Sequence, residues 1–168
     1  YAHKYLAEVN FGYNGSEQFA PGHKMGFFPS FSIGWVLTEE AFMDKLKNYL
    51  SYMKIRASYG QVGNDNMNGT RFAFLTLWSG SYESQIGNKK LEWEKANKYN
   101  IGIETRLFKD FGLDVDLFYE RRNNILIPAT GLIPTGVFGT GGVKASGIIP
   151  KINAGIIDNK GMEITASF

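Results

Sequence analysis

Three carboxylates lie close together in the segment 112–122, at Asp114, Asp116 and Glu120. Two carboxyl groups about 5–10 Å apart can cleave a glycosidic bond when they flank a cleft. These three occupy alternate positions of one extended segment beside basic residues, and no second element supplies the rest of a catalytic centre. We therefore expect no catalytic residue here, and we expect that the protein is not an enzyme.

A possible calcium loop begins at Asn64, where Asn66, Asn68 and Gly69 follow at suggestive positions. The first position of such a loop carries Asp and the twelfth a bidentate Glu, but Asn64 and Leu75 stand there. Asparagine is also a common turn residue. We predict turns rather than a metal site.

Other binding motifs are also incomplete. The glycine-rich stretch 136–146 lacks the Gly-Lys-Ser/Thr ending of a phosphate-binding loop. His3 and His23 have no second ligand at metal-binding spacing, and the chain has no cysteine. We expect no metal and no cofactor.

The composition indicates a β-rich chain with two solvent environments. The 168 residues include 20 Gly, 9 Tyr and 13 Phe, yet the mean hydropathy is −0.21. No run of about 18 apolar residues is present, so a membrane-spanning helix is excluded, and a net charge of +2 indicates no nucleic-acid partner. The opening YAHKYLAEV already alternates and lacks a signal-peptide pattern, so we expect a fragment of a longer exported protein.

Apolar residues alternate with small or polar ones in six stretches, which is typical of strands whose two faces meet different environments. A tilted strand needs about 9–11 residues to cross a bilayer, and large aromatics near the strand ends suit the interfacial girdles of a membrane barrel. We predict antiparallel transmembrane strands with one face on lipid and the other on an aqueous lumen. The predicted strands are 1–13, 27–37, 53–60, 98–107, 112–122 and 161–168.

The connections between these strands alternate between long and short. Because membrane barrels have long loops outside and short turns in the periplasm, segments 15–25, 62–90 and 123–151 are expected outside, and 38–48 and 108–111 in the periplasm. Within 38–50 we predict one short amphipathic helix, with Thr38 as N-cap and Phe42, Leu46 and Leu50 on one face.

The polar faces of the predicted strands carry most of the charge. One interpretation is a wall that contacts a plug or a hydrated solute, and the other is a solvated or cross-strand-paired inner face. The expected lumen-facing residues are Lys54, Arg56, Lys98, Glu104, Arg106, Asp114, Asp116, Glu120 and Glu163.

Two aromatic residues, Trp78 and Tyr82, fall in the first of the two longest outer loops. Aromatic side chains can stack on a sugar or pack against a lid protein. Packing within the loop or anchoring at the membrane interface explains them equally well. We propose them as the candidate residues for substrate or partner contact.

The strand pattern leaves two fold classes open. One is an all-β transmembrane barrel segment of about six long strands, and the alternative is a secreted β-sandwich that binds carbohydrate. Soluble strands average about 5–6 residues, whereas these alternations run longer. Bacterial barrels begin at about eight strands, so we expect residues 1–168 to be part of a larger barrel domain.

Several phrases resemble one known family in the family's own order. They are FGYNGSEQFAPGHKMGFFPSFSIGWVLTEEAFM, LKNYLSYMKIRASYGQVGND, IGNKKLEWEKANKYNIGIE and INAGIIDNKGMEI, and they are similar to the barrel of SusC/RagA-family TonB-linked outer-membrane transporters. The resemblance implies a barrel of about 22 strands around an N-terminal plug domain, in the outer membrane of a Gram-negative bacterium. It also implies a SusD-like lipoprotein partner and import of oligosaccharides or peptides energised by the TonB complex. We expect the plug and the remaining strands to lie outside this chain.

Overall fold

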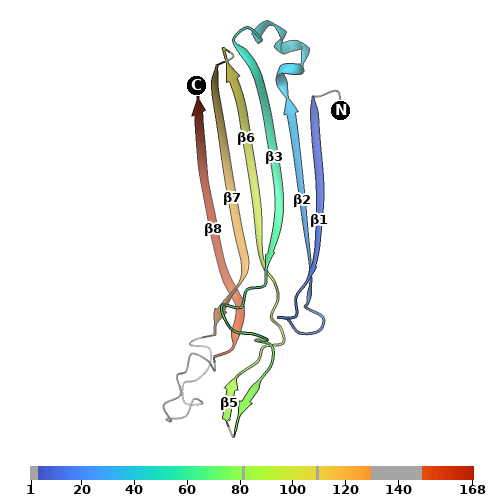
Figure 1. Cartoon of the computed structure of the whole chain (residues 1–168), viewed down its shortest axis with the longest axis vertical. Coiled ribbons are helices and arrows are strands. Elements are labelled where there is room, and N and C mark those ends of the chain that lie inside the picture. The colour runs from blue at the N-terminus through green and yellow to red at the C-terminus, as the bar shows by residue number, and fades with distance from the viewer. Residues whose placement is uncertain (1–3, 81, 109, 130–148) are drawn as a thin grey trace.

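Six long antiparallel strands form one sheet. The computed structural model describes residues 4–80, 82–108, 110–129 and 149–168, and the side chain of Tyr82 is also outside this description. The strands occur in the order β1-β2-β3-β6-β7-β8, so each one pairs with its neighbour along the main sheet (Figure 1). Their bounds are β1 Tyr5–Gly15, β2 Met25–Val36, β3 Leu50–Asn64, β6 Glu94–Leu107, β7 Phe111–Pro128 and β8 Lys151–Ser167.

A second, two-stranded sheet lies beyond the outer end of the main one. It consists of β4 (Leu77–Ser79) and β5 (Tyr82–Gln85). Figure 1 shows this hairpin projecting from the end opposite the short helices. No helix in the described part of the chain is long and apolar enough to cross a membrane.

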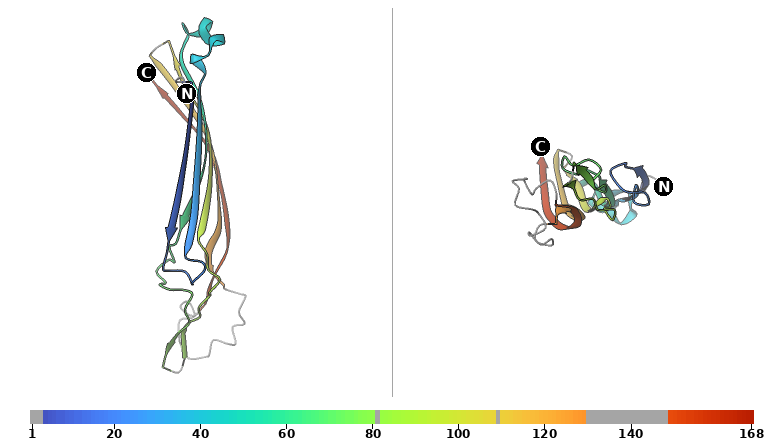
Figure 2. Two further views of the ribbon diagram at one scale, coloured as in Figure 1. Left: turned by 90° about the vertical axis from the view of Figure 1, so that its right-hand side faces the viewer. Right: turned by 90° about the horizontal axis from the view of Figure 1, so that it is seen from below.

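The apolar residues form continuous rows across the main sheet. One row runs through Ala7, Ile33, Ala57, Ile101, Leu117 and Met162. Ile33 is 64 % exposed and Met162 60 %, and Figure 2 shows the six strands edge-on as a single thin layer. The β-sandwich alternative is therefore wrong: among the described residues no second sheet covers this face.

Most strands extend further toward the outer loops than the alternation predicts. β7 has 18 residues and ends at Pro128, and β3 continues to Asn64. Asn14-Gly15 does not break β1, because Gly15 still pairs with Met25. The hydropathy alternation ends before the strand does, for example at the polar run 121–124 of β7, but backbone pairing continues beyond it to Pro128. The predicted loop 62–90 therefore starts later and contains β4 and β5.

The predicted helix between β2 and β3 is wrong in type and continuity. Two 3₁₀ helices, Leu37–Glu39 and Ala41–Leu46, occupy this connection. Glu40 between them has extended backbone angles, φ −85° and ψ 141°, which interrupt any longer helix. Thr38 is not an N-cap, since its Oγ1 accepts a hydrogen bond from the Met53 amide at 3.4 Å, and Leu50 begins β3.

Glu40 holds the short connection against the end of the sheet. Its carboxylate accepts hydrogen bonds from the Tyr5 hydroxyl at 2.8 Å, from Trp35 Nε1 at 3.2 Å and from Lys4 Nζ at 3.3 Å. The bond from Tyr5, followed by the bond from Trp35, lowers the pKa of Glu40 below its ordinary value. The ionised carboxylate therefore fixes two aromatic residues at this end of β1 and β2.

Lowering the pH is expected to weaken this connection. The stabilisation by Glu40 is present above the carboxyl's ordinary pKa of 4.5 and is lost as the pH falls through the lower folded value. Between about pH 6 and pH 3 the thermal midpoint of the full-length protein should fall more in the wild type than in Glu40→Gln. Thermal unfolding followed at several pH values measures this, with the exposed neighbour changed in Glu39→Gln as control. The same pH response in Glu40→Gln and the wild type contradicts the role given to Glu40.

Candidate functional site

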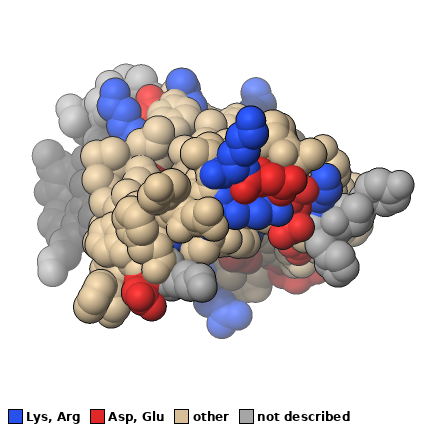
Figure 3. All heavy atoms as spheres, turned by 90° about the horizontal axis from the view of Figure 1, so that it is seen from above, with Lys and Arg blue, Asp and Glu red and all other residues tan. Residues whose placement is uncertain are grey.

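The predicted charged residues share one face of the sheet. Lys54 and Arg56 lie on β3, Lys98 and Glu104 on β6, and Asp116 and its neighbours on β7. The register places them opposite the apolar rows, because side chains alternate along each strand. Viewed from the 3₁₀-helix end, basic and acidic side chains lie against one another in one patch (Figure 3).

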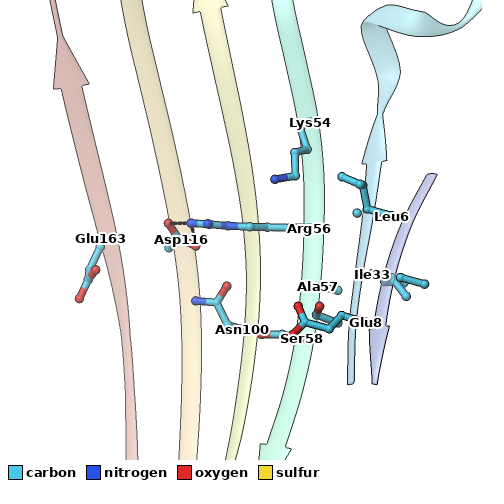
Figure 4. Close-up of a pocket in the computed structure, with 13 residues that line it drawn as sticks. Leu6, Glu8, Ile33, Lys54, Arg56, Ala57, Ser58, Asn100, Asp116 and Glu163 are labelled. Carbon is cyan, nitrogen blue, oxygen red and sulfur yellow. Dashed lines mark hydrogen bonds and ion pairs between the residues drawn. The ribbon is translucent and has the colours of Figure 1, made fainter. Parts of the chain in front are cut away.

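Arg56 is at the centre of the first ion-pair network. Its guanidinium reaches across β6 to Asp116 on β7, with Nη2 2.6 Å from Oδ2 and 2.8 Å from Oδ1 (Figure 4). Nη1 also lies 3.0 Å from a Glu104 oxygen, and Lys54 Nζ lies 3.6 Å from the other. Two cations and two carboxylates thus form one balanced group.

Gly102 makes this crossing possible. It lies between Arg56 and Asp116 in the register. A Cβ at this position would stand 2.5 Å from Arg56 Nε and 2.5 Å from Asp116 Oδ1. The arginine therefore bridges two strands because the strand between them has no side chain at that point.

A second network joins β6 and β7 nearer the outer end. Glu120 accepts a hydrogen bond from Arg122 Nε at 2.5 Å and lies 3.7 Å from Lys98 Nζ. Arg122 also approaches Glu94 at 3.9 Å. A separate pair, Arg106 with Asp114 at 3.6 Å, lies toward the other end. These charged residues are thus paired with one another, both between strands and along β7.

Glu163 on β8 is the exception among the predicted wall residues. It has no ion pair within the part of the chain that the structure describes, and in Figure 4 its carboxylate points away from the Arg56 network. A hollow of about 660 Å³ lies over this face, with Ser32, Ser58 and Asn100 beside Arg56 in its lining. The arrangement presents amide, hydroxyl and paired charged groups, which can hydrogen-bond a hydrated solute or a packed polypeptide.

Adding a methyl group at Gly102 is expected to break the Arg56–Asp116 contact. Gly102→Ala should lower the free energy of unfolding by about 1–3 kcal/mol, because the pair must separate and leave a carboxylate short of partners. Gly60→Ala is the matched control, since its Cβ would meet only Ser30 Cβ, at an ordinary 3.5 Å. Urea unfolding of the full-length protein in vesicles measures both variants. Equal stability of the two variants would show that the Arg56–Asp116 contact does not contribute to stability.

The outer ends of the strands carry a small apolar core on the polar side of the sheet, which we call the outer shelf. Phe19 and Leu91 in the connections are fully buried, and Trp93 is 8 % exposed. The Phe28 ring covers Gly63, where a Cβ would lie 2.1 Å from the ring. The outer shelf consists of Phe19, Phe28, Met67, Ala73, Leu91, Trp93 and Leu126.

Hydrogen bonds join the surroundings of the outer shelf across two connections and the start of β8. Trp93 Nε1 donates to the Lys24 carbonyl at 3.0 Å. Asn153 and Glu92 exchange two bonds, at 2.8 Å and 2.9 Å, and Asn88 Nδ2 donates to the Lys151 carbonyl at 2.8 Å. The sequence analysis missed this cluster. The available signal was Phe28, a large aromatic in an otherwise small and polar series.

The two predicted contact residues lie in the projecting hairpin. Trp78 in β4 is 64 % exposed, and Tyr82 begins β5 opposite Ser79. The side chain of Tyr82 lies outside the described residues. Their proposed contact role stays a prediction.

The incomplete motifs acquire ordinary structural explanations. Asn64 Oδ1 accepts a bond from the Asn66 amide, and Asn66 Oδ1 accepts one from the Asn68 amide, which makes successive Asx turns. His23 pairs with Glu92 at 3.4 Å. No group of metal-ligating side chains occurs among the described residues, and the predictions for His3 and 136–146 concern residues outside that description.

The apolar face has an oblique upper boundary. Toward the long connections, the unbroken series of apolar or aromatic residues on this face reaches Tyr13 on β1 but only Met162 on β8, where Lys160 and Asp158 separate it from Ile156. The register row of Met162 meets β1 at Ala7. The boundary thus shifts by about six residues over the sheet, a slope of about 40° with about 3.3 Å per residue and about 4.8 Å between strands. Strands of membrane barrels tilt by about 35–45°.

An aromatic ladder crosses the same face close to this boundary, along one register row from β2 to β7. Phe31 stacks on Tyr59 at 6.3 Å between ring centroids, Tyr59 lies 5.0 Å from Tyr99, and Tyr99 stacks on Tyr119 at 6.0 Å. Tyr5 and Trp35 occupy the opposite end of the same face on β1 and β2. An apolar band between two aromatic rows is the exterior of a β-barrel in a membrane.

These features define a segment of an outer-membrane β-barrel wall. The family model described as TonB dependent receptor-like, beta-barrel matches residues 5–168, so the chain belongs to this family. The family is one of receptors and transporters, which confirms that the chain is not an enzyme and that it is located in the outer membrane.

Individual relatives agree with this assignment. The chain is 29% identical over 175 residues to TonB-dependent receptor P39 of Formosa agariphila, covering 98% of this chain and 16% of that protein. It is 27% identical over 184 residues to TonB-dependent receptor SusC of Bacteroides thetaiotaomicron, covering 96% and 17%. The chain therefore spans about a sixth of the length of these relatives.

A solved structure has the same fold. The RagAB peptide importer in its "closed-closed" state superposes with a TM-score of 0.77 at 19% identity, over 97% of this chain and 18% of that one. The resemblance to the SusC/RagA family and the predicted barrel-segment fold are confirmed.

Proposed function

We propose that this chain forms part of the wall of an active importer, a barrel of about 22 strands that takes up oligosaccharides or peptides. The exposed apolar rows, with their oblique boundary and the nearby aromatic ladder, carry the proposal, because contact with hydrocarbon makes such a face favourable over six strands. SusC and the RagAB peptide importer are among the proteins that this chain resembles. The second of these names supports peptides as a solute class, and oligosaccharides are the other class implied by the resemblance of the sequence.

The two edges of the sheet support a larger barrel. β1 and β8 each pair on one side only within the described residues. An unpaired backbone group in lipid costs several kcal/mol, so neighbouring strands of the same barrel must cover both edges. Residues 1–168 are accordingly a part of the barrel domain, with the plug and the remaining strands elsewhere in the protein.

The polar face is proposed as the lumen wall. Lys54, Arg56, Glu104 and Asp116 neutralise one another, so this stretch favours an uncharged or zwitterionic hydrated solute over a strongly charged one. Lys98, Asp114, Glu120 and Glu163 complete the wall, where the plug or the solute makes contact.

The end with long connections is proposed as extracellular. There Trp78 is exposed, and we propose that Trp78 and Tyr82 contact a SusD-like lipoprotein or the solute. The short connection with the two 3₁₀ helices lies in the periplasm, on the side from which the TonB complex acts through the plug.

The membrane role is tested first by electrophoresis. The unheated full-length protein from outer membranes should migrate faster in detergent than the boiled protein, because the closed barrel resists unfolding. Identical migration of a soluble monomeric protein contradicts the proposal. Uptake of labelled neutral oligosaccharides and of short peptides, with and without the co-expressed lipoprotein, then assigns the solute class.

A further inference from the structure

Three cations lie on the apolar face beside its outer boundary. Lys95 is on β6, Arg121 on β7 and Lys160 on β8. In the strand register Arg121 is opposite Asn97 of β6, and Lys160 is opposite Tyr119 of β7. Strand alternation therefore places all three on the same face as Tyr99 and the apolar rows.

The three cations follow the oblique boundary. From β6 to β8 each one lies two residues closer to the middle of the sheet than the one before, as the ladder registers show. Lys160 follows Met162 directly on this face, and Arg121 follows Tyr119. If the apolar band spans the membrane, all three reach nearly the same depth, just outside its oblique boundary.

Their charges are poorly neutralised, in contrast to those of the opposite face. Neither Lys95 nor Lys160 has a side-chain hydrogen bond or ion pair with another residue in the described ranges. Arg121 lies 3.7 Å from Asp158, which also accepts a bond from the Tyr119 hydroxyl, and it donates to Asn123 at 3.3 Å. With Asp158 counted, this patch keeps a net charge of about +2 at neutral pH.

Cations at this depth meet the head groups of the leaflet that borders the long connections. Each lysine or arginine near an anionic lipid surface strengthens the binding of a protein to that surface by about fivefold. We propose that Lys95, Arg121 and Lys160 bind the phosphate groups of an anionic phosphorylated lipid in that outer leaflet. This inference rests on the proposed membrane-spanning role of the apolar face.

The test compares two variants of the full-length protein in detergent. In Lys95→Gln/Arg121→Gln/Lys160→Gln the patch is neutralised, and in Lys89→Gln/Lys90→Gln two exposed lysines of an outer connection are neutralised as the control. Binding of bisphosphorylated lipid A is titrated by native mass spectrometry. The triple variant should bind at least about tenfold more weakly than the wild type, and the control should bind like the wild type.

Two further arms identify the source of the phosphate. Dephosphorylated lipid A should bind weakly to every variant, and inorganic phosphate at the same concentration should not displace lipid A. Equal binding by the triple variant and the wild type overturns the proposal, as does full competition by inorganic phosphate. Heat-modifiable migration is followed in parallel. Its absence in the wild type contradicts the membrane-spanning role. Its presence, together with lipid binding that is unchanged in the triple variant, contradicts only the lipid-binding inference.

Discussion

Replacing Ile103 with lysine is expected to destabilise the protein in a membrane by about 2–4 kcal/mol. Ile103 lies between Ile55 and Val115 in an apolar row, and it is four residues from Tyr99 along β6. It is therefore near the middle of the apolar band, where a lysine must bring its charge into hydrocarbon. Equilibrium unfolding of the full-length protein in phospholipid vesicles measures the loss.

The matched control lies on the other face of the same strand. Asn100 borders the hollow over the polar side, and Asn100→Lys should change the free energy of unfolding by less than about 0.5 kcal/mol. If the two lysine variants have equal stability, the faces of β6 do not differ in environment. That result would contradict the membrane assignment of the apolar rows.

Removing the indole of Trp93 is expected to lower the free energy that stabilises the outer shelf by about 3–5 kcal/mol. The Trp93 ring lies 5.4 Å from the Phe19 ring and 5.3 Å from the Phe28 ring, between a connection and a strand. Its Nε1 also satisfies the Lys24 carbonyl. Trp93→Ala therefore leaves a cavity and an unpaired carbonyl at the point where two connections and the start of β8 meet.

Hydrogen exchange of the full-length protein measures this effect locally. In Trp93→Ala the amides of 16–24 and 65–76 should exchange faster, whereas those in the middle of β6 and β7 keep their protection. Trp78→Ala is the control, because Trp78 is exposed on the projecting hairpin. Unchanged exchange in Trp93→Ala would show that the outer shelf does not hold the connections together.

Strand number, strand direction and the two faces were predictable from the sequence because period-two hydropathy records them directly. Strand ends were not. β7 continues to Pro128 through the polar run 121–124 and then three consecutive apolar residues, Ile125, Leu126 and Ile127. Neither part has period-two hydropathy, so only backbone pairing defines this segment. The 3₁₀ helices were missed for a related reason, since the extended Glu40 is fixed by Tyr5 and Trp35 from outside the connection.

The composition of the polar wall was predictable, but its pairing was not. Arg56, Gly102 and Asp116 lie far apart in the sequence and come together only through the registers of β3, β6 and β7. A glycine in a strand gives no indication of which arginine will cross it. The outer shelf depends in the same way on long connections, whose paths no periodicity encodes.

The central claim is that odd and even positions of one strand see lipid and water respectively. Single spin labels placed at 98, 99, 100, 101, 103 and 104 in the full-length protein, in vesicles, test it most directly. We expect collision with oxygen to be high at 99, 101 and 103, and collision with a water-soluble nickel chelate to be high at 98, 100 and 104. The same response at all six positions would contradict it, as would oxygen collision that is high at the even positions and chelate collision that is high at the odd ones.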